Sequence, residues 1–385
     1  MSDPTQAPPA GDPPGAPAPA TDAAADRVFE AADIQRGLWL WLGVVTAGGV
    51  LAALLGHAEG AILFAAAGAF ALAQASDAAA TLEGYRRFVD DEMPSDRLHG
   101  RLLRFLAGAL VPIAGALFYA AFGAYAWSGA GEKPLVFVAW WCFGAALVSL
   151  SLASRRVADL VTWALFRGAT GRTRRLTARL TVLALMLPLA ALPVMPGLLA
   201  QLKQSGGALA DAPGLAAQLL AEIAVAFAGV GLFVRRDWSA VRERLGLQAM
   251  RPAHAVLALA GLVAAVVLNG GSGWIEQHVF PALFAHDEDV TRMIAARLPF
   301  VTSLLLGTSA GVGEELMMRG ALQPRLGIPL CSLLFASAHV QYSWFGMLTV
   351  GLLGVLLGVI RARSNTTTAI VVHALYDIYA AVTTH

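Results

Sequence analysis

The stretch LPFVTSLLLGTSAGVGEELMMRG, residues 298–320, carries two adjacent glutamates, Glu314 and Glu315, at the end of a long apolar run. A membrane-spanning α-helix needs roughly 20 predominantly apolar residues, and residues 299–319 form such a run. We therefore expect this run to cross a membrane as a helix. Because ionisable side chains are costly inside a membrane and commonly mark functional sites, the same stretch also indicates where chemistry takes place.

The composition of the whole chain indicates an integral membrane protein. Hydrophobic residues make up 57% of its 385 residues and charged residues only 14%, whereas soluble domains carry roughly 25% charged residues. The formal net charge of +1 gives no support to a nucleic-acid partner. Apolar runs of spanning length predict an all-α, polytopic membrane bundle of about eleven helices. Their expected ranges are 37–56, 60–76, 102–127, 134–153, 181–200, 214–234, 253–269, 299–319, 329–341, 344–360 and 366–383.

The connecting loops alternate between two kinds. Arginine-rich loops, such as GRTRRLTAR at 171–179 and RRDWSAVRERLG at 235–246, alternate with loops that are poor in basic residues. Because basic loops stay cytoplasmic, we expect a multi-pass protein of the cell membrane with its N-terminus inside and its C-terminus outside. Its alanine- and arginine-rich composition favours a bacterial source and therefore the bacterial inner membrane. The longest outer connector, 270–298, is expected to hold an interfacial helix at 287–297.

Three regions follow from these patterns. Residues 1–30 are rich in proline and alanine, which predicts a disordered tail. Residues 31–250 form an N-terminal transmembrane region of unknown role. Residues 251–385 form a C-terminal transmembrane region that contains most of the ionisable residues inside predicted helices.

The spacing of these residues predicts how they face one another. Glu315 and Arg319 are four positions apart, so on an α-helix they stack on one face and neutralise each other. Glu314 is turned by about 100° from its neighbour and has no such partner. His373 and Asp377 are also four positions apart and share one stripe of the last helix.

Depth along the helices favours a single site. Glu314 is expected roughly 8 Å above the inner end of its helix and His373 roughly 12 Å above the start of the last one, at 1.5 Å per residue. His339 is expected roughly 15 Å along a helix that starts at Pro329. The three side chains therefore fall at similar depth in the cytoplasmic half of the membrane.

One glutamate and two histidines at one depth suit two kinds of chemistry. Glu314 and His339 can activate water as a general base, while the second histidine and a nearby carboxyl group stabilise an oxyanion. Alternatively, Glu314, His339 and His373 can bind zinc, which activates its own water. The H-E-x-x-H motif is absent, but a zinc site assembled from separate helices stays open.

Three motifs give the chain a resemblance to a known family. They are E-E-x-x-x-R at residues 314–319 (EELMMR), F-x-x-x-H at residues 335–339 (FASAH) and H-x-x-x-N/D at residues 373–377 (HALYD). Because the three motifs occur in this order, the chain resembles the CPBP family. These intramembrane glutamic proteases include the CAAX prenyl endopeptidases and the bacteriocin-processing proteins. The resemblance covers the C-terminal region and implies that residues 251–385 are a catalytic core.

The resemblance implies an endopeptidase in which Glu314 activates water with the help of His339. His373 and Asp377 are then expected to stabilise the oxyanion, although the prenyl endopeptidases have asparagine where Asp377 stands. The implied substrate is a membrane-anchored or lipidated peptide cut near the cytoplasmic leaflet of the bilayer, without a cofactor, zinc being the lesser alternative. Supporting roles fall to the remaining motif residues, Glu315, Arg319 and Phe335.

Two other functions compete with this one. A non-catalytic membrane scaffold or immunity protein of the same family would use residues 31–250 to bind a partner. A proton-coupled transporter would use the buried acids and histidines as relays, but it predicts charged groups across the whole membrane. Glu222 is a lone carboxylate in the middle of a predicted helix, where we expect a hydrogen bond to a neighbouring helix rather than a functional role.

Overall fold

The computed structural model describes residues 29–89, 97–128, 135–168, 171–204, 209–295 and 299–383. Regular structure in these ranges is helical apart from one isolated β-bridge between Leu232 and Arg236, which confirms the all-α class. The predicted tail lies almost entirely outside the described residues. The N-terminal helices are α1 (Ala31–Leu54), α2 (Ala58–Val89), α3 (Arg97–Ser128), α4 (Val136–Ser151), α5 (Arg155–Phe166), α6 (Arg172–Ala191), α7 (Met195–Gln204), α8 (Ala212–Val230) and α9 (Trp238–Leu245). The C-terminal helices are α10 (Pro252–Val279), α11 (Pro281–Ala295), α12 (Phe300–Ser309), the π-helices η1 (Ala310–Glu314) and η2 (Leu316–Leu322), α13 (Gln323–Ser337), α14 (Trp344–Arg363) and α15 (Thr366–Thr383).

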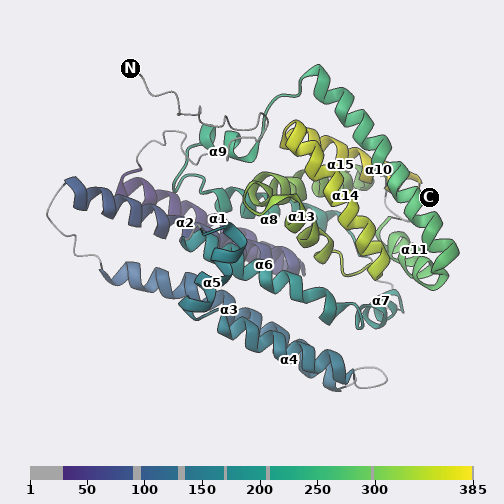
Figure 1. Ribbon diagram of the computed structural model, residues 1–385, viewed down its shortest axis with the longest axis horizontal. Coiled ribbons are helices and arrows are strands. Elements are labelled where there is room, and N and C mark those ends of the chain that lie inside the picture. Colours follow the sequence, from purple (N-terminus) through teal and green to yellow (C-terminus); the bar gives the residue numbers. More distant parts are fainter. Residues whose placement is uncertain are drawn as a thin grey trace, which may run out of the picture.

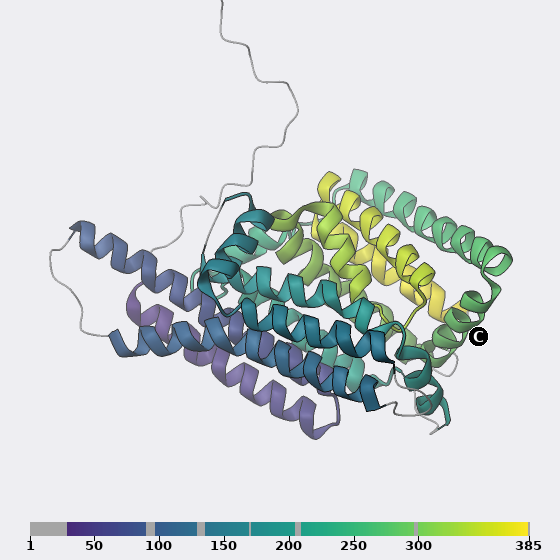
Figure 2. The ribbon, with the colours of Figure 1, turned by 60° about the horizontal axis from the view of Figure 1, so that its bottom comes forward.

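Helix α8 lies between the two halves of the chain. Helices α1 to α6, purple to teal, gather on one side of the bundle, and α10 to α15, green to yellow, gather on the other (Figure 1, Figure 2). Helix α8 packs against α1 and α2 on one side and against α12, η1 and η2 on the other. One hydrophobic core joins the halves, since it contains Val225 and Leu245 together with Leu316 and Ala321.

Many of the helices are long and apolar enough to cross a membrane. Six of those described pass this test, α1, α2, α3, α8, α10 and α14, and the number rises to 8 when two bent helix pairs are each taken as one span. The bends are 98° between α4 and α5 and 70° between α6 and α7. The chain is therefore a multi-pass membrane protein. The expected number of about eleven spans stays a prediction.

Several element boundaries differ from those expected. Helix α10 continues through Gly270, Gly271 and Gly273 to Val279, where a connector was predicted. Each glycine weakens a helix by about 1 kcal/mol relative to alanine but does not break it, and the helix ends before Pro281. Helix α11 accordingly begins at Pro281, six residues before the predicted interfacial helix at 287–297.

Glycines place the glutamate pair beside the last helix. A Cβ atom on Gly311 would lie 2.6 Å from Cβ of Ala374, and one on Gly307 would lie 2.7 Å from the carbonyl oxygen of Ala374. No larger residue fits at these positions without displacing α15. Small residues at helix contacts are the usual means by which membrane helices approach closely. This contact sets Glu314, three residues after Gly311, beside α15.

Candidate active site

The glutamate pair lies at the junction of two π-helical segments rather than within a regular α-helix. Residues Ala310–Glu314 and Leu316–Leu322 are π-helical, with hydrogen bonds from i to i+5 and less rotation per residue than an α-helix has. The rotation between successive residues in these turns is therefore smaller than the roughly 100° of an α-helix, and Glu315, which stands between the two π-helical segments, contacts His373 of α15. The helical run also continues through Leu322 and into α13, so Glu314 lies farther from its end than expected.

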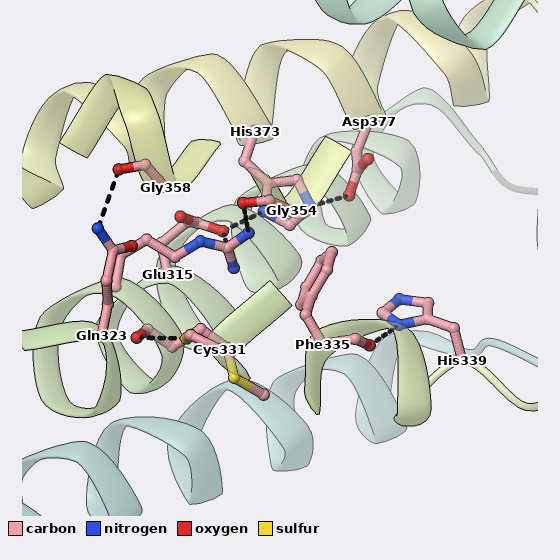
Figure 3. A network of polar contacts seen from close by, with 11 residues as sticks. Glu315, Gln323, Cys331, Phe335, His339, Gly354, Gly358, His373 and Asp377 are labelled. Atoms are coloured by element: carbon pink, nitrogen blue, oxygen red, sulfur yellow. Dashed lines mark hydrogen bonds and ion pairs between the residues drawn. The ribbon is translucent and has the colours of Figure 1, made fainter. Parts of the chain in front are cut away.

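Glu315 and Arg319 form the predicted ion pair. Nη1 of Arg319 lies 2.9 Å from Oε1 of Glu315, and their side chains are 1% and 0% exposed. Nη2 of Arg319 donates a hydrogen bond to the carbonyl oxygen of Gly354, at 3.2 Å. Gly354 stands near the middle of α14. The pair is thus neutralised and anchored to α14 near its middle (Figure 3).

His373 lies between two carboxylates. Its Nδ1 is 2.9 Å from Oε1 of Glu315 and its Nε2 is 3.4 Å from Oδ2 of Asp377. The histidine is buried, whereas the side chain of Asp377 is 23% exposed. Contacts at both ring nitrogens fix the plane of the imidazole. The contact with Asp377 suits a role in orienting His373 (Figure 3).

His339 stands outside the helix on which it was predicted. Helix α13 ends at Ser337, so His339 lies in the turn before α14. Its Nδ1 is 2.8 Å from the carbonyl oxygen of Phe335. A carbonyl oxygen only accepts hydrogen bonds, so Nδ1 carries the proton in this contact. In the neutral ring, Nε2 then keeps its lone pair and can act as a base.

The turn that carries His339 is held from outside by two acids. Asp287 of α11 accepts hydrogen bonds from the backbone nitrogen of Ser343, at 2.6 Å, and from its hydroxyl group, at 2.8 Å. The same hydroxyl lies 3.1 Å from Oε1 of Glu276. Nε2 of His286 donates to the carbonyl oxygen of Gln341 at 3.0 Å. These contacts hold the turn between α13 and α14 in place, although the turn itself is not helical.

Glu314 is the carboxylate without a neutralising arginine. Its Oε2 atom is buried and has no hydrogen-bond partner among the described residues. The carboxyl group interacts electrostatically with His339, His373 and Asp377. The structure therefore brings the four predicted catalytic residues into one neighbourhood, with Glu314 at its centre.

The ring of Phe335 stands between the two imidazoles. Its centroid lies 4.8 Å from that of His339 and 5.9 Å from that of His373 (Figure 3). The guanidinium carbon of Arg319 lies 4.5 Å above the same ring. No group of three His, Cys, Asp or Glu side chains in the described part of the chain could hold one metal ion.

The structure adds two residues to this neighbourhood. Glu222 of α8 interacts electrostatically with Glu314 and His373, and its Oε1 accepts a hydrogen bond from Gln218 of its own helix at 3.1 Å. The expected bond to a neighbouring helix is not found in the described residues. Tyr342, in the turn after α13, interacts electrostatically with Glu314, and burial raises the pKa of its phenol to about 12.

Sequence offered a signal for only one of the two. A carboxylate in mid-membrane marks Glu222 as unusual, but its neighbours depend on how α8 packs. Tyr342 carries no such signal, because an aromatic residue near a helix end is ordinary in membrane proteins.

Comparison with known proteins is consistent with this geometry. Residues 296–379 match the family model described as Rce1-like, type II CAAX prenyl endopeptidase. The matched range contains all three motifs, α12 to α14 and most of α15. No curated protein and no solved structure matches the chain. The C-terminal region of this membrane protein, residues 296–379, is therefore a member of the Rce1-like, or CPBP, family of CAAX prenyl endopeptidase-like proteins.

Proposed function

We propose that the chain is an intramembrane endopeptidase that hydrolyses a peptide bond with water activated by Glu314. One observation carries this proposal. Of two adjacent glutamates, Glu315 is neutralised by Arg319 and contacts His373 through Oε1, whereas Glu314 forms no ion pair among the described residues. The Oε2 atoms of both glutamates are buried without a hydrogen-bond partner there. A free carboxylate beside two histidines has the composition of a general-base site.

The proposed reaction begins with proton transfer. The carboxylate of Glu314, assisted by the lone pair on Nε2 of His339, removes a proton from a water molecule. The resulting hydroxide oxygen bonds to the carbonyl carbon of the substrate. When the tetrahedral intermediate collapses, the C–N bond breaks and the departing amine takes the proton back from Glu314 or His339.

The oxyanion of the intermediate needs donors. His373 is held by Glu315 and Asp377 at its two nitrogens, and the longer contact is the one to Asp377. The hydrogen on Nε2 is fixed in the plane of the imidazole, so a developing oxyanion that approaches Nε2 in this plane can compete with Asp377 for the hydrogen bond. Preorganised donors of this kind commonly lower the activation barrier, by about 3 kcal/mol for one donor.

The proposed substrate is a peptide anchored in the membrane, with a lipid group as the anchor in the CAAX case. The site lies at the level of Gly354, in the middle of α14. A peptide held by a lipid can reach this depth, and we propose that it enters from the cytoplasmic leaflet of the cell membrane. The protein's partners are then the bilayer and this substrate, and no cofactor takes part.

The substitution Glu314→Gln tests the proposed activity. We would reconstitute the wild type and the variant in lipid nanodiscs and add a fluorescence-quenched, farnesylated CAAX peptide. The variant is expected to lose activity by at least about 10²-fold, as for a missing general base, while folding normally. Glu288→Gln, an exposed acid paired with Arg292 at 2.6 Å, is the control. Equal cleavage by Glu314→Gln and wild type would instead favour a scaffold.

A further inference from the structure

The hydroxyl group of Ser343 is the centre of a polar cluster next to the turn that carries His339. Ser343 is the N-cap residue of α14, and its Oγ atom accepts a hydrogen bond from the backbone nitrogen of Gly346 at 3.0 Å. The same Oγ atom lies 2.8 Å from Oδ2 of Asp287 and 3.1 Å from Oε1 of Glu276. The two acids are 8% and 5% exposed, and the serine is 5% exposed. Two carboxyl groups therefore meet at one buried hydroxyl group.

This cluster lacks a hydrogen when both acids are ionised. A hydroxyl group donates one hydrogen bond and accepts two, whereas an ionised carboxylate only accepts. Because Oγ of Ser343 already accepts from Gly346, it can donate to one acid and accept one further bond from the other. The contact with the second acid is a hydrogen bond only if that acid carries a proton. Two acceptors that face each other without a hydrogen would be costly in a buried place.

The distances assign this proton to Glu276. Oδ1 of Asp287 accepts the backbone N–H of Ser343 at 2.6 Å, and Oδ2 of the same acid is the carboxyl oxygen nearer to Oγ. Hydrogen bonds to ionised carboxylates are shorter than those between neutral groups. The contact of Glu276 at 3.1 Å is longer than both contacts of Asp287, as expected for a neutral carboxyl group. The donors then run from Glu276 to Ser343 and from Ser343 to Asp287.

The other charged residues of α11 and α14 have contacts elsewhere. On α11, Glu288 pairs with Arg292 at 2.6 Å and Asp289 pairs with Lys203 at 3.0 Å. The charged residues of α14 lie in its last turn, at the end opposite Ser343, and are Arg361 and Arg363. These cations therefore do not replace the missing hydrogen.

The remaining titratable neighbours also leave the proton on Glu276. Nε2 of His286 contacts the carbonyl oxygen of Gln341, a bond that the neutral and the charged ring can both donate. Nδ1 of His278 contacts a carbonyl oxygen of its own helix, α10. Tyr342 interacts electrostatically with Asp287 and with Asp377 of α15. The negative charge of Asp287 disfavours a second one beside it.

We propose that Glu276 carries the proton of this cluster and is a positioning residue for His339, because the hydrogen bonds through Ser343 to Asp287 hold the turn between α13 and α14. The positioning role rests on the proposed peptidase function, whereas the location of the proton does not. Glu276 and Asp287 precede the matched family range, 296–379, so a segment outside that range supports the site. Loss of the proton leaves one hydrogen for two ionised carboxylates, so the turn should loosen and kcat should fall as the pH rises.

The proton can be located without any substrate. Infrared absorption of protonated carboxyl groups is measured in nanodiscs for the wild type, Glu276→Gln, Asp287→Asn and the exposed control Glu288→Gln. Glu276→Gln should lose one component of the carboxyl band, and Glu288→Gln should lose none.

Asp287→Asn should lose the same component as Glu276→Gln. The backbone N–H of Ser343 keeps the carbonyl oxygen of the new amide at the position of Oδ1, so the amide nitrogen donates to Oγ. The hydroxyl hydrogen of Ser343 is then left for Glu276, which accepts it only when ionised. A component that survives in either variant, or that Glu288→Gln also removes, overturns the assignment of the proton.

The positioning role is tested by the pH profile of kcat with the farnesylated CAAX peptide. In Glu276→Gln the amide donates to Oγ at any pH, so kcat near neutral pH should be retained and its fall on the alkaline side should disappear. Glu276→Leu should lower kcat by about 10-fold or more, as when a group that orients a catalytic residue is lost, with KM unchanged. An alkaline fall that is identical in Glu276→Gln and the wild type, or an unchanged kcat in Glu276→Leu, overturns the positioning role.

The two experiments separate this inference from the proposed function. If the wild type cleaves no peptide, the proposed function fails with this probe and the positioning role fails with it. The infrared comparison then decides alone where the proton lies.

Discussion

Oε1 of Glu315 lies 2.9 Å from Nδ1 of His373. The same oxygen lies 2.9 Å from Nη1 of Arg319, so one atom joins the motif on the π-helical turns to the motif on α15. This contact divides the work between two adjacent glutamates. Glu315 holds the histidine of the last helix in place, and the proposed function assigns water activation to Glu314.

Loss of Arg319 should destabilise the fold. Arg319→Met leaves the buried carboxylate of Glu315 without its guanidinium, and breaking a buried pair in this way costs about 3–5 kcal/mol. Thermal unfolding in nanodiscs would show a large drop in Tm. The control is Arg292→Met, because Arg292 is 57% exposed in its pair with Glu288 and such pairs contribute at most about 1 kcal/mol. Equal shifts in the two variants would contradict the structural role of the buried pair.

The two nitrogens of His339 should be separable by substitution. In His339→Asn, the amide nitrogen replaces Nδ1 and keeps the bond to the carbonyl oxygen of Phe335, but nothing replaces Nε2. We expect normal Tm with kcat reduced by about 10²-fold or more. His339→Gln, whose amide reaches the position of Nε2, serves as the comparison. Full activity in His339→Asn would show that Nε2 takes no part as a base.

Asp377 should tolerate an amide. If its role is to accept a hydrogen bond from Nε2 of His373, the carbonyl oxygen of asparagine can take over that role. Asp377→Asn is therefore expected to retain most of kcat on the farnesylated peptide, whereas Asp377→Leu loses about 10- to 100-fold. Inactivity of Asp377→Asn with a normal Tm would mean that the negative charge itself is required.

Parts of the site followed from sequence because local spacing survives changes of helix type. Residues four positions apart meet on one side of a helix, and this predicted both the Glu315–Arg319 pair and the contact of His373 with Asp377.

Other features depend on hydrogen-bond register and tertiary packing. Glu315 stands between two π-helical segments, and no residue type announces such segments in advance. Helix α13 ends at Ser337, two residues before His339. The apolar periodicity of the sequence does not reveal this end. The place of Glu222 depends on the contact of α8 with Gly313. These two segments are far apart in the sequence, so no local pattern of residues predicts that they meet.

The most direct test of the central claim is an experimental structure of the wild type in lipid at a resolution that reveals ordered water. Glu314 as general base predicts a water molecule within hydrogen-bond distance of both its carboxylate and Nε2 of His339. Side chains of Glu314 and His339 that lie far apart or face the hydrocarbon, or a metal ion bound between them, would contradict it.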